Sequence, residues 1–157
     1  MLNVMKEQKG SVLAVRLIGS IEESVNFDSL IGARPDELHI NCKEVPRINS
    51  IGVKAWIRYF SSLQQKGTKL RFQECSTAIV EQINLISNFT CGGAVESVYV
   101  PFSCSQCHGE FIALFATENL KKVAMNLPEL PCPKCAGRAS FDDIPEEYFG
   151  FLLRADG

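Results

Sequence analysis

The chain has 157 residues, of which 46% are hydrophobic and 22% are charged. This composition is typical of a folded globular protein of about one average domain and excludes a disordered chain. Sixteen basic and eighteen acidic residues give a net charge of −2, so no global positive field attracts nucleic acid or anionic lipid.

No apolar run approaches the roughly 18 residues of a membrane span. Lys6, Glu7 and Lys9 interrupt the region where a secretory signal needs apolar residues. We therefore expect a cytoplasmic protein without membrane insertion.

Three segments in the first half of the chain alternate apolar and polar side chains with the two-residue period of a half-buried strand. They are residues 10–20, 37–42 and 69–73. In the second segment Leu38 and Ile40 share a face with Cys42, so we interpret Cys42 as a small buried hydrophobe. His39 lies on the other face and is expected to be solvated or bonded locally. Residues 94–100 are predicted to form a further, closing strand.

Two amphipathic helices are predicted between these strands. The first repeats apolar residues at spacings of three and four, namely Val53, Trp56, Ile57, Phe60 and Leu63. It ends at Lys66 and Gly67, a basic last turn followed by a glycine. The second begins at a cap formed by Ser76 or Thr77 and buries Ile79, Val80, Ile83 and Ile86. Strands that alternate with crossover helices require a parallel or mixed sheet flanked by helices, so residues 1–100 are predicted to form an α/β domain.

Residues 101–157 carry two copies of the pattern Cys-x-x-Cys-x-Gly, formed by Cys104, Cys107, Cys132 and Cys135 with their glycines. Two thiolates separated by two residues can bind one ion from a tight turn, and two such turns complete a tetrahedron. The following glycines, Gly109 and Gly137, are expected to turn the backbone through positive φ. These features predict a zinc-ribbon subdomain with one structural Zn²⁺, because four thiolates leave no open position for water.

The rest of this second part is expected to support the ribbon. Residues 111–116 are predicted to form a hairpin strand. Asp142, Asp143 and Pro145 indicate a capped helix start, followed by an apolar anchor around Tyr148 that packs back on the body.

Three other interpretations of the cysteines remain open. Cys104, Cys107 and His108 formally match the attachment motif of a c-type haem, but haem attachment normally occurs outside the cytoplasm and leaves the second pair without a role. Redox-active pairs are the second alternative, although neither pair lies between a strand and a helix of a thioredoxin-like unit. Iron in place of zinc is the third. No Ser-His-acid trio or glycine-rich phosphate loop stands out, so we expect no enzyme.

The segment ELHINCKEVPRINSIGVKAW, residues 37–56, resembles the centre of STAS domains, the family of bacterial anti-sigma factor antagonists. There an apolar strand leads to Asp-Ser-Ser/Thr-Gly at a helix start. VRLIGSI at residues 15–21 and KGTKLRF at residues 66–72 support the resemblance, which covers about residues 10–100. It implies a compact domain of mixed sheet and helices that binds other proteins and is often switched by phosphorylation.

The family's phosphorylated residue is the serine or threonine before the glycine, and here that position is Ile51. Asn49 stands where the family has aspartate, while Ser50 and Gly52 match its pattern. Isoleucine has no oxygen to receive a phosphate, so we expect the usual switch to be lost.

The resemblance also places the partner at this motif loop and its helix. The sequence between positions 43 and 71 contains seven basic residues and a single acidic residue, Glu44. They form either a solvated helix face or a basic docking face for a regulatory protein such as an anti-sigma factor. The predicted partner-binding residues are Asn49, Ser50, Ile51, Gly52, Lys54 and Arg58. The alternative function is a zinc-ribbon nucleic-acid-binding regulator. Against it, residues 101–157 contain five basic and eight acidic residues.

Overall fold

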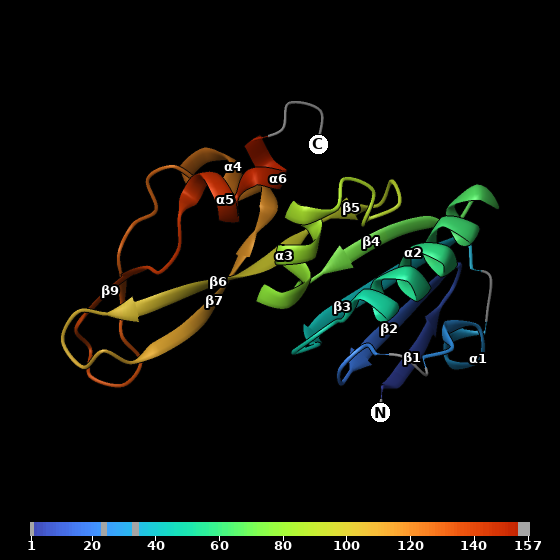
Figure 1. Ribbon diagram of the computed structural model, residues 1–157, viewed down its shortest axis with the longest axis horizontal. Coiled ribbons are helices and arrows are strands. Elements are labelled where there is room, and N and C mark those ends of the chain that lie inside the picture. Colours follow the sequence, from blue (N-terminus) through green and yellow to red (C-terminus); the bar gives the residue numbers. More distant parts are fainter. Residues whose placement is uncertain (1, 23–24, 33–34, 154–157) are drawn as a thin grey trace.

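The computed structural model describes residues 2–22, 25–32 and 35–153. Figure 1 shows two lobes, each built around its own sheet. We call residues 2–95 the first lobe and residues 97–153 the second lobe. The hydrophobic side chains buried in both lobes form one contiguous core. In the described part of the chain, no helix is long and apolar enough to cross a membrane.

The first lobe contains a five-stranded mixed sheet in the order β1-β2-β3-β4-β5. Its strands are β1 (Asn3–Lys9), β2 (Val12–Ile18), β3 (Glu37–Glu44), β4 (Lys69–Gln73) and β5 (Ala94–Val95). β1 is antiparallel to β2, and the remaining neighbours are parallel. The predicted α/β class with a mixed sheet is therefore confirmed. β1 is not predicted from the sequence, because most of its residues are polar and exposed and show no alternation.

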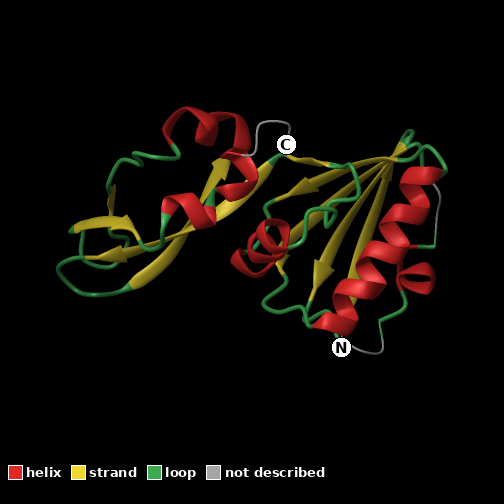
Figure 2. Ribbon diagram, turned by 45° about the horizontal axis from the view of Figure 1, so that its top comes forward, coloured by secondary structure: helices red, strands yellow, loops and turns green. Residues whose placement is uncertain are grey.

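Helix α2 (Ser50–Gln65) lies across one face of this sheet (Figures 1 and 2), and the short α1 (Phe27–Ile31) packs beside it. The predicted apolar face of α2 is confirmed: Trp56 and Phe60 are fully buried. The Trp56 ring stacks on Phe72 with centroids 5.5 Å apart, and its Nε1 donates to the Phe89 carbonyl at 2.9 Å. Because the Trp56 ring is packed against Phe72 and its N–H group is hydrogen-bonded, this cluster fixes the helix on the sheet.

Helix α3 (Thr77–Leu85) begins at Ser76, whose Oγ accepts a hydrogen bond from the Ile79 amide at 3.4 Å. Ile86 is the C-cap and ends this helix.

On the sheet face that carries polar side chains, Glu37 forms hydrogen bonds with both His39 at 2.5 Å and Arg71 at 3.0 Å. His39 is thus bonded locally, as expected.

The second lobe contains a four-stranded antiparallel sheet in the order β7-β6-β9-β8. Its strands are β6 (Ser97–Cys104), β7 (Glu110–Ala116), β8 (Leu130–Pro131) and β9 (Arg138–Phe141). β7 confirms the predicted hairpin strand. The single closing strand expected over residues 94–100 is wrong, because β5 pairs with β4 whereas β6 pairs with β7 and β9. β6 also spans positions 100 and 101, between which the sequence analysis divides the chain.

The C-terminal part of the second lobe packs back on the first, as predicted. Its helices are α4 (Thr117–Val123), α5 (Pro145–Tyr148) and α6 (Gly150–Leu153). The Tyr148 hydroxyl donates to the Tyr99 carbonyl at 2.6 Å. The Asn84 side chain of α3 donates to the Tyr148 carbonyl and accepts from the Phe151 amide, both at 2.8 Å. These bonds tie α5 and α6 to α3 and β6.

Candidate metal centre

Two tight turns of the second lobe bring the four predicted ligands together. Cys104 is the last residue of β6 and Cys107 lies in the turn that follows, whereas Cys132 and Cys135 lie in the turn between β8 and β9. All four sulfur atoms lie within 4.8 Å of one another. The Cys104 and Cys135 sulfurs are 3.5 Å apart, and those of Cys107 and Cys132 are 3.7 Å apart. A tetrahedron with metal–sulfur bonds of about 2.3 Å has edges of about 3.8 Å, so this cluster can hold a metal ion.

Backbone amides of each turn point at its sulfur atoms. The amides of Gln106 and Cys107 lie 3.4 and 3.5 Å from the Cys104 sulfur. The turn at Cys132 repeats the arrangement, with the Lys134 amide 3.4 Å from the Cys132 sulfur. The amides of Cys107 and Gln106 lower the pKa of Cys104 to about 6, and backbone amides likewise lower the pKa of Cys132. Amide hydrogen bonds favour the thiolate, which is the form that binds metal.

The two glycines of the motif have a different role from the one expected. Positive φ falls one residue earlier, at His108 (60°) and Ala136 (63°), and not at Gly109 or Gly137. The Gly109 and Gly137 amides each donate to the preceding cysteine sulfur at 3.4 Å. A Cβ at Gly137 would lie 2.7 Å from Gln106 Oε1, and one at Gly109 would lie 3.2 Å from Lys134 Cδ. The glycines therefore permit close approach of the two turns.

The four thiols are arranged with two toward the core and two toward solvent. Cys104 and Cys132 are buried, whereas Cys107 and Cys135 are exposed. The neighbouring strands are short: β8 has two residues and β9 has four. Strands of this length have little cohesion of their own. An ion that joins the two turns would therefore hold this end of the second lobe together.

The other sequence-predicted site residues lie in the first lobe, at the start of α2. Asn49 is the N-cap, and its Oδ1 accepts from the Gly52 amide at 2.7 Å. Gly52 is buried. A Cβ there would meet the Ile21 carbonyl oxygen at 2.2 Å, so the position has no room for a side chain. Ser50 is exposed, and Ile51 is 49% exposed. Helix capping and close packing thus account physically for Asn49 and Gly52.

Lys54 and Arg58 are exposed on the outer arc of α2. Neither forms an ion pair with any residue that the structure describes. Arg71, by contrast, bonds Glu37 at 3.0 Å and Glu96 at 2.9 Å. The basic surplus counted along the sequence is therefore partly neutralised, whereas Lys54 and Arg58 remain exposed on the outer arc of α2.

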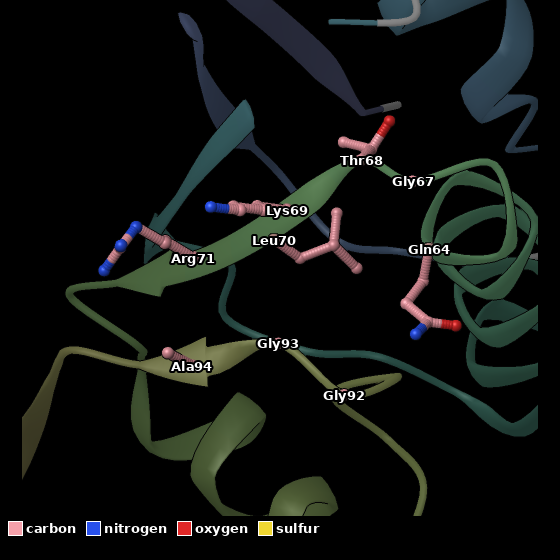
Figure 3. A pocket seen from close by; sticks show the side chains of 9 residues that line it. All are labelled: Gln64, Gly67, Thr68, Lys69, Leu70, Arg71, Gly92, Gly93 and Ala94. Carbon is pink, nitrogen blue, oxygen red and sulfur yellow. The ribbon is translucent and has the colours of Figure 1, made fainter. Parts of the chain in front are cut away.

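A cavity of about 390 Å³ lies where β5 stops short beside β4. Figure 3 shows Leu70 on the side of β4 that faces Gln64, with Lys69 and Arg71 directed to the opposite side. The guanidinium of Arg71 is already bonded to two carboxylates. Lys69 and Arg71 both line the cavity, but they lie on the side of β4 opposite Gln64.

A comparison with models of known protein families matches none of them to this chain, and no curated protein matches it. Sequence spacing found the four sulfur ligands. It missed the amide donors, and it missed the positive φ at His108 and Ala136 because it placed positive φ at the glycines that follow them.

Proposed function

We propose that this protein is a non-catalytic, cytoplasmic regulatory module of the anti-sigma factor antagonist type, which binds a protein partner at the start of α2. The observation that carries the proposal is Ile51, a large apolar side chain that is 49% exposed on the first turn of a capped helix. An apolar side chain loses contact with water when a partner covers it, and this burial favours binding. Lys54 and Arg58 lie further along the same helix and would favour an acidic partner.

The rigidity of this surface supports the proposal. The Asn49 amide donates to the Ile21 carbonyl at 3.2 Å, while its side chain caps the helix. Next to this loop lies a cavity of about 300 Å³, lined in part by Arg47, Asn49 and Glu81. A partner that contacts Ile51 would find a preformed surface, so it would lose little entropy in ordering the loop.

We further propose that the four cysteines hold one Zn²⁺ and that its role is structural. Four thiolates close the coordination sphere of zinc, so no position is left for water or substrate. The charge of the loaded site supports a protein partner over nucleic acid, because four thiolates and one divalent cation sum to −2. Iron is the competing metal, and elemental analysis of protein purified without added metal separates the two.

Affinity capture from the native cell extract, followed by mass spectrometry, tests the proposed partner surface. We expect a protein that the wild type retains, that Ile51→Lys loses, and that Leu85→Lys retains. Leu85 is the matched control, because it is a large apolar residue on α3 that is 76% exposed. Equal capture by both variants would contradict the proposed surface. Retention of nucleic acid in place of a protein would favour the alternative function.

A further inference from the structure

The two sheets have four edge strands, and three of them are protected against pairing with another chain. β1 carries Lys6, Glu7 and Lys9, and the Lys6 ammonium donates to the Ile31 carbonyl at 3.2 Å. β5 and β8 have only two residues each, and β8 includes Pro131, which lacks an N–H. Charges, shortness and proline are the usual devices that keep sheet edges from associating.

β7 is the fourth edge, and it has none of these devices. Its sequence, EFIALFA, runs for seven residues with one charge at its first position. It pairs with β6 in unbroken register. Ile112 is 49% exposed and Leu114 is 47% exposed. In Figure 1, β7 runs from the lower left of the second lobe up toward α4 and α6, and β6 is its neighbour in the sheet. A long, regular, apolar edge of this kind is able to accept a further strand.

The hydrogen bonds of β6 show which backbone groups of β7 face outward. Pro101, opposite Ile112, accepts from the Asp142 amide at 3.0 Å. Tyr99, opposite Leu114, donates its amide to the Cys75 carbonyl at 2.9 Å. Both residues therefore point their backbone groups away from β7, and each forms a non-hydrogen-bonded pair with its partner. In such pairs the opposite residue also points away, so the N–H and C=O groups of Ile112 and Leu114 face the free edge.

We propose that a second copy of this chain occupies that edge, through antiparallel pairing of β7 with β7 about Ala113. The sequence around Ala113 is self-complementary, because a twofold axis there places Ile112 opposite Leu114 and Phe111 opposite Phe115. Ile112 and Leu114 are also the residues whose backbone groups are available, so each opposed couple forms two intermolecular hydrogen bonds.

The side chains fit the same register. Ile112 and Leu114 of one copy meet the same two residues of the other and bury apolar surface that is half exposed in the single chain. Glu110 falls opposite Ala116, so the charge at the strand end meets no like charge. Closure by a twofold axis makes the interface isologous and stops growth at two copies. The product is one continuous eight-stranded sheet, four strands from each copy.

Sedimentation equilibrium on the full, metal-loaded chain tests the proposal. We expect a species of twice the 17.4 kDa chain mass that dissociates on dilution. The double variant Ile112→Lys/Leu114→Lys opposes two lysines at each couple and should raise the dissociation constant at least about tenfold. The matched variant Ile112→Lys/Leu114→Glu opposes a lysine to a glutamate at each couple and should restore the dimer.

Hydrogen exchange locates the interface independently of mass. The Ile112 and Leu114 amides should exchange at least about tenfold more slowly in the dimer than in the two-lysine variant. The Ala113 amide faces β6 in this register and should exchange equally slowly in both. A wild-type chain that sediments as a monomer would overturn the proposal. So would a two-lysine variant that stays dimeric, or a lysine–glutamate variant that is folded and monomeric.

Discussion

Around Trp56 the first lobe packs three further aromatic rings, with centroid distances of 4.7 Å to Phe89, 4.8 Å to Phe60 and 5.5 Å to Phe72. Around Cys132 the second lobe offers strands of two and four residues and a cluster of four sulfur atoms. The first arrangement gains its stability from apolar burial, which needs no added component. The second has four thiols placed to hold an ion, and a bound ion would join the two turns. Burial stabilises one end of the chain, whereas ligation of an ion would stabilise the other.

Loss of a metal ligand should have the largest effect on stability, and the destabilised region should be the second lobe. With Cys132→Ser we expect the loss of most of the binding free energy, on the order of 10 kcal/mol for a structural zinc site. Elemental analysis should find no bound metal, and hydrogen exchange should show loss of protection around β8 and β9 with β2 and β3 still protected. Cys42→Ala is the control, because Cys42 is a buried thiol outside the cluster. Metal retained by Cys132→Ser would remove the proposed contrast between the lobes.

Trp56→Ala should destabilise the first lobe, because it removes a buried apolar side chain. Trp56 is fully buried and its Nε1 bonds the Phe89 carbonyl. Truncation should lower the free energy of unfolding by about 3–5 kcal/mol, through the cavity and the unpaired carbonyl. Denaturant titration measures this loss. Metal content of the folded variant should equal that of wild type. A folded variant without metal would show that the metal site in the second lobe depends on the core of the first.

A smaller and more local pair of changes should separate the two backbone features of the turn at Cys135. Gly137→Ala crowds Gln106, and we expect it to weaken metal binding by about 1 kcal/mol. Ala136→Gly relieves a φ of 63° and should strengthen binding by up to about 1 kcal/mol. Competition with a chelator measures both. Adding Gln106→Ala to Gly137→Ala should recover most of the loss, and equal affinity in all four proteins would contradict the crowding argument.

The smallest effect on stability is expected for Lys54→Glu/Arg58→Glu, which touches neither burial nor ligation. The free energy of unfolding should change by less than about 0.5 kcal/mol. Binding of an acidic partner should weaken and lose salt dependence, as titrations at two ionic strengths would show. Lys121→Glu/Lys122→Glu reverses two exposed cations on α4 and serves as the control. Unchanged binding by the first variant would assign Lys54 and Arg58 to a solvated face.

The pattern of side chains predicted the strands whose apolar residues alternate, such as Leu38 and Ile40 in β3, and the helix whose apolar face includes Trp56. It missed β1, because an exposed edge strand needs no apolar face, and α1, because a helix of five residues has too little periodicity. It also merged β5 with β6. Whether a strand pairs with one sheet or another depends on residues distant in the sequence, and alternation is the same in both cases.

The candidate site was predictable to a similar degree. The spacing of Cys104, Cys107, Cys132 and Cys135 is local information, and it correctly identified the residues that meet in space. The assignment of positive φ to the glycines was wrong, because the need for glycine arises from contact between the two turns, which only the tertiary structure defines. The free edge of β7 escaped notice for the same reason, since a sequence does not state which of its strands lack a neighbour.

The separation of the two cysteine turns along the chain has a consequence for synthesis. Twenty-four residues lie between Cys107 and Cys132. A ribosome that adds about 5–20 residues each second therefore delivers the second turn roughly one to five seconds after the first. β7 is made within that interval. During that interval the nascent chain carries an apolar strand and only two of the four thiols, so the proposed zinc site cannot form until the second turn is made, and a shortage of the metal would lengthen the time that the site stays unligated.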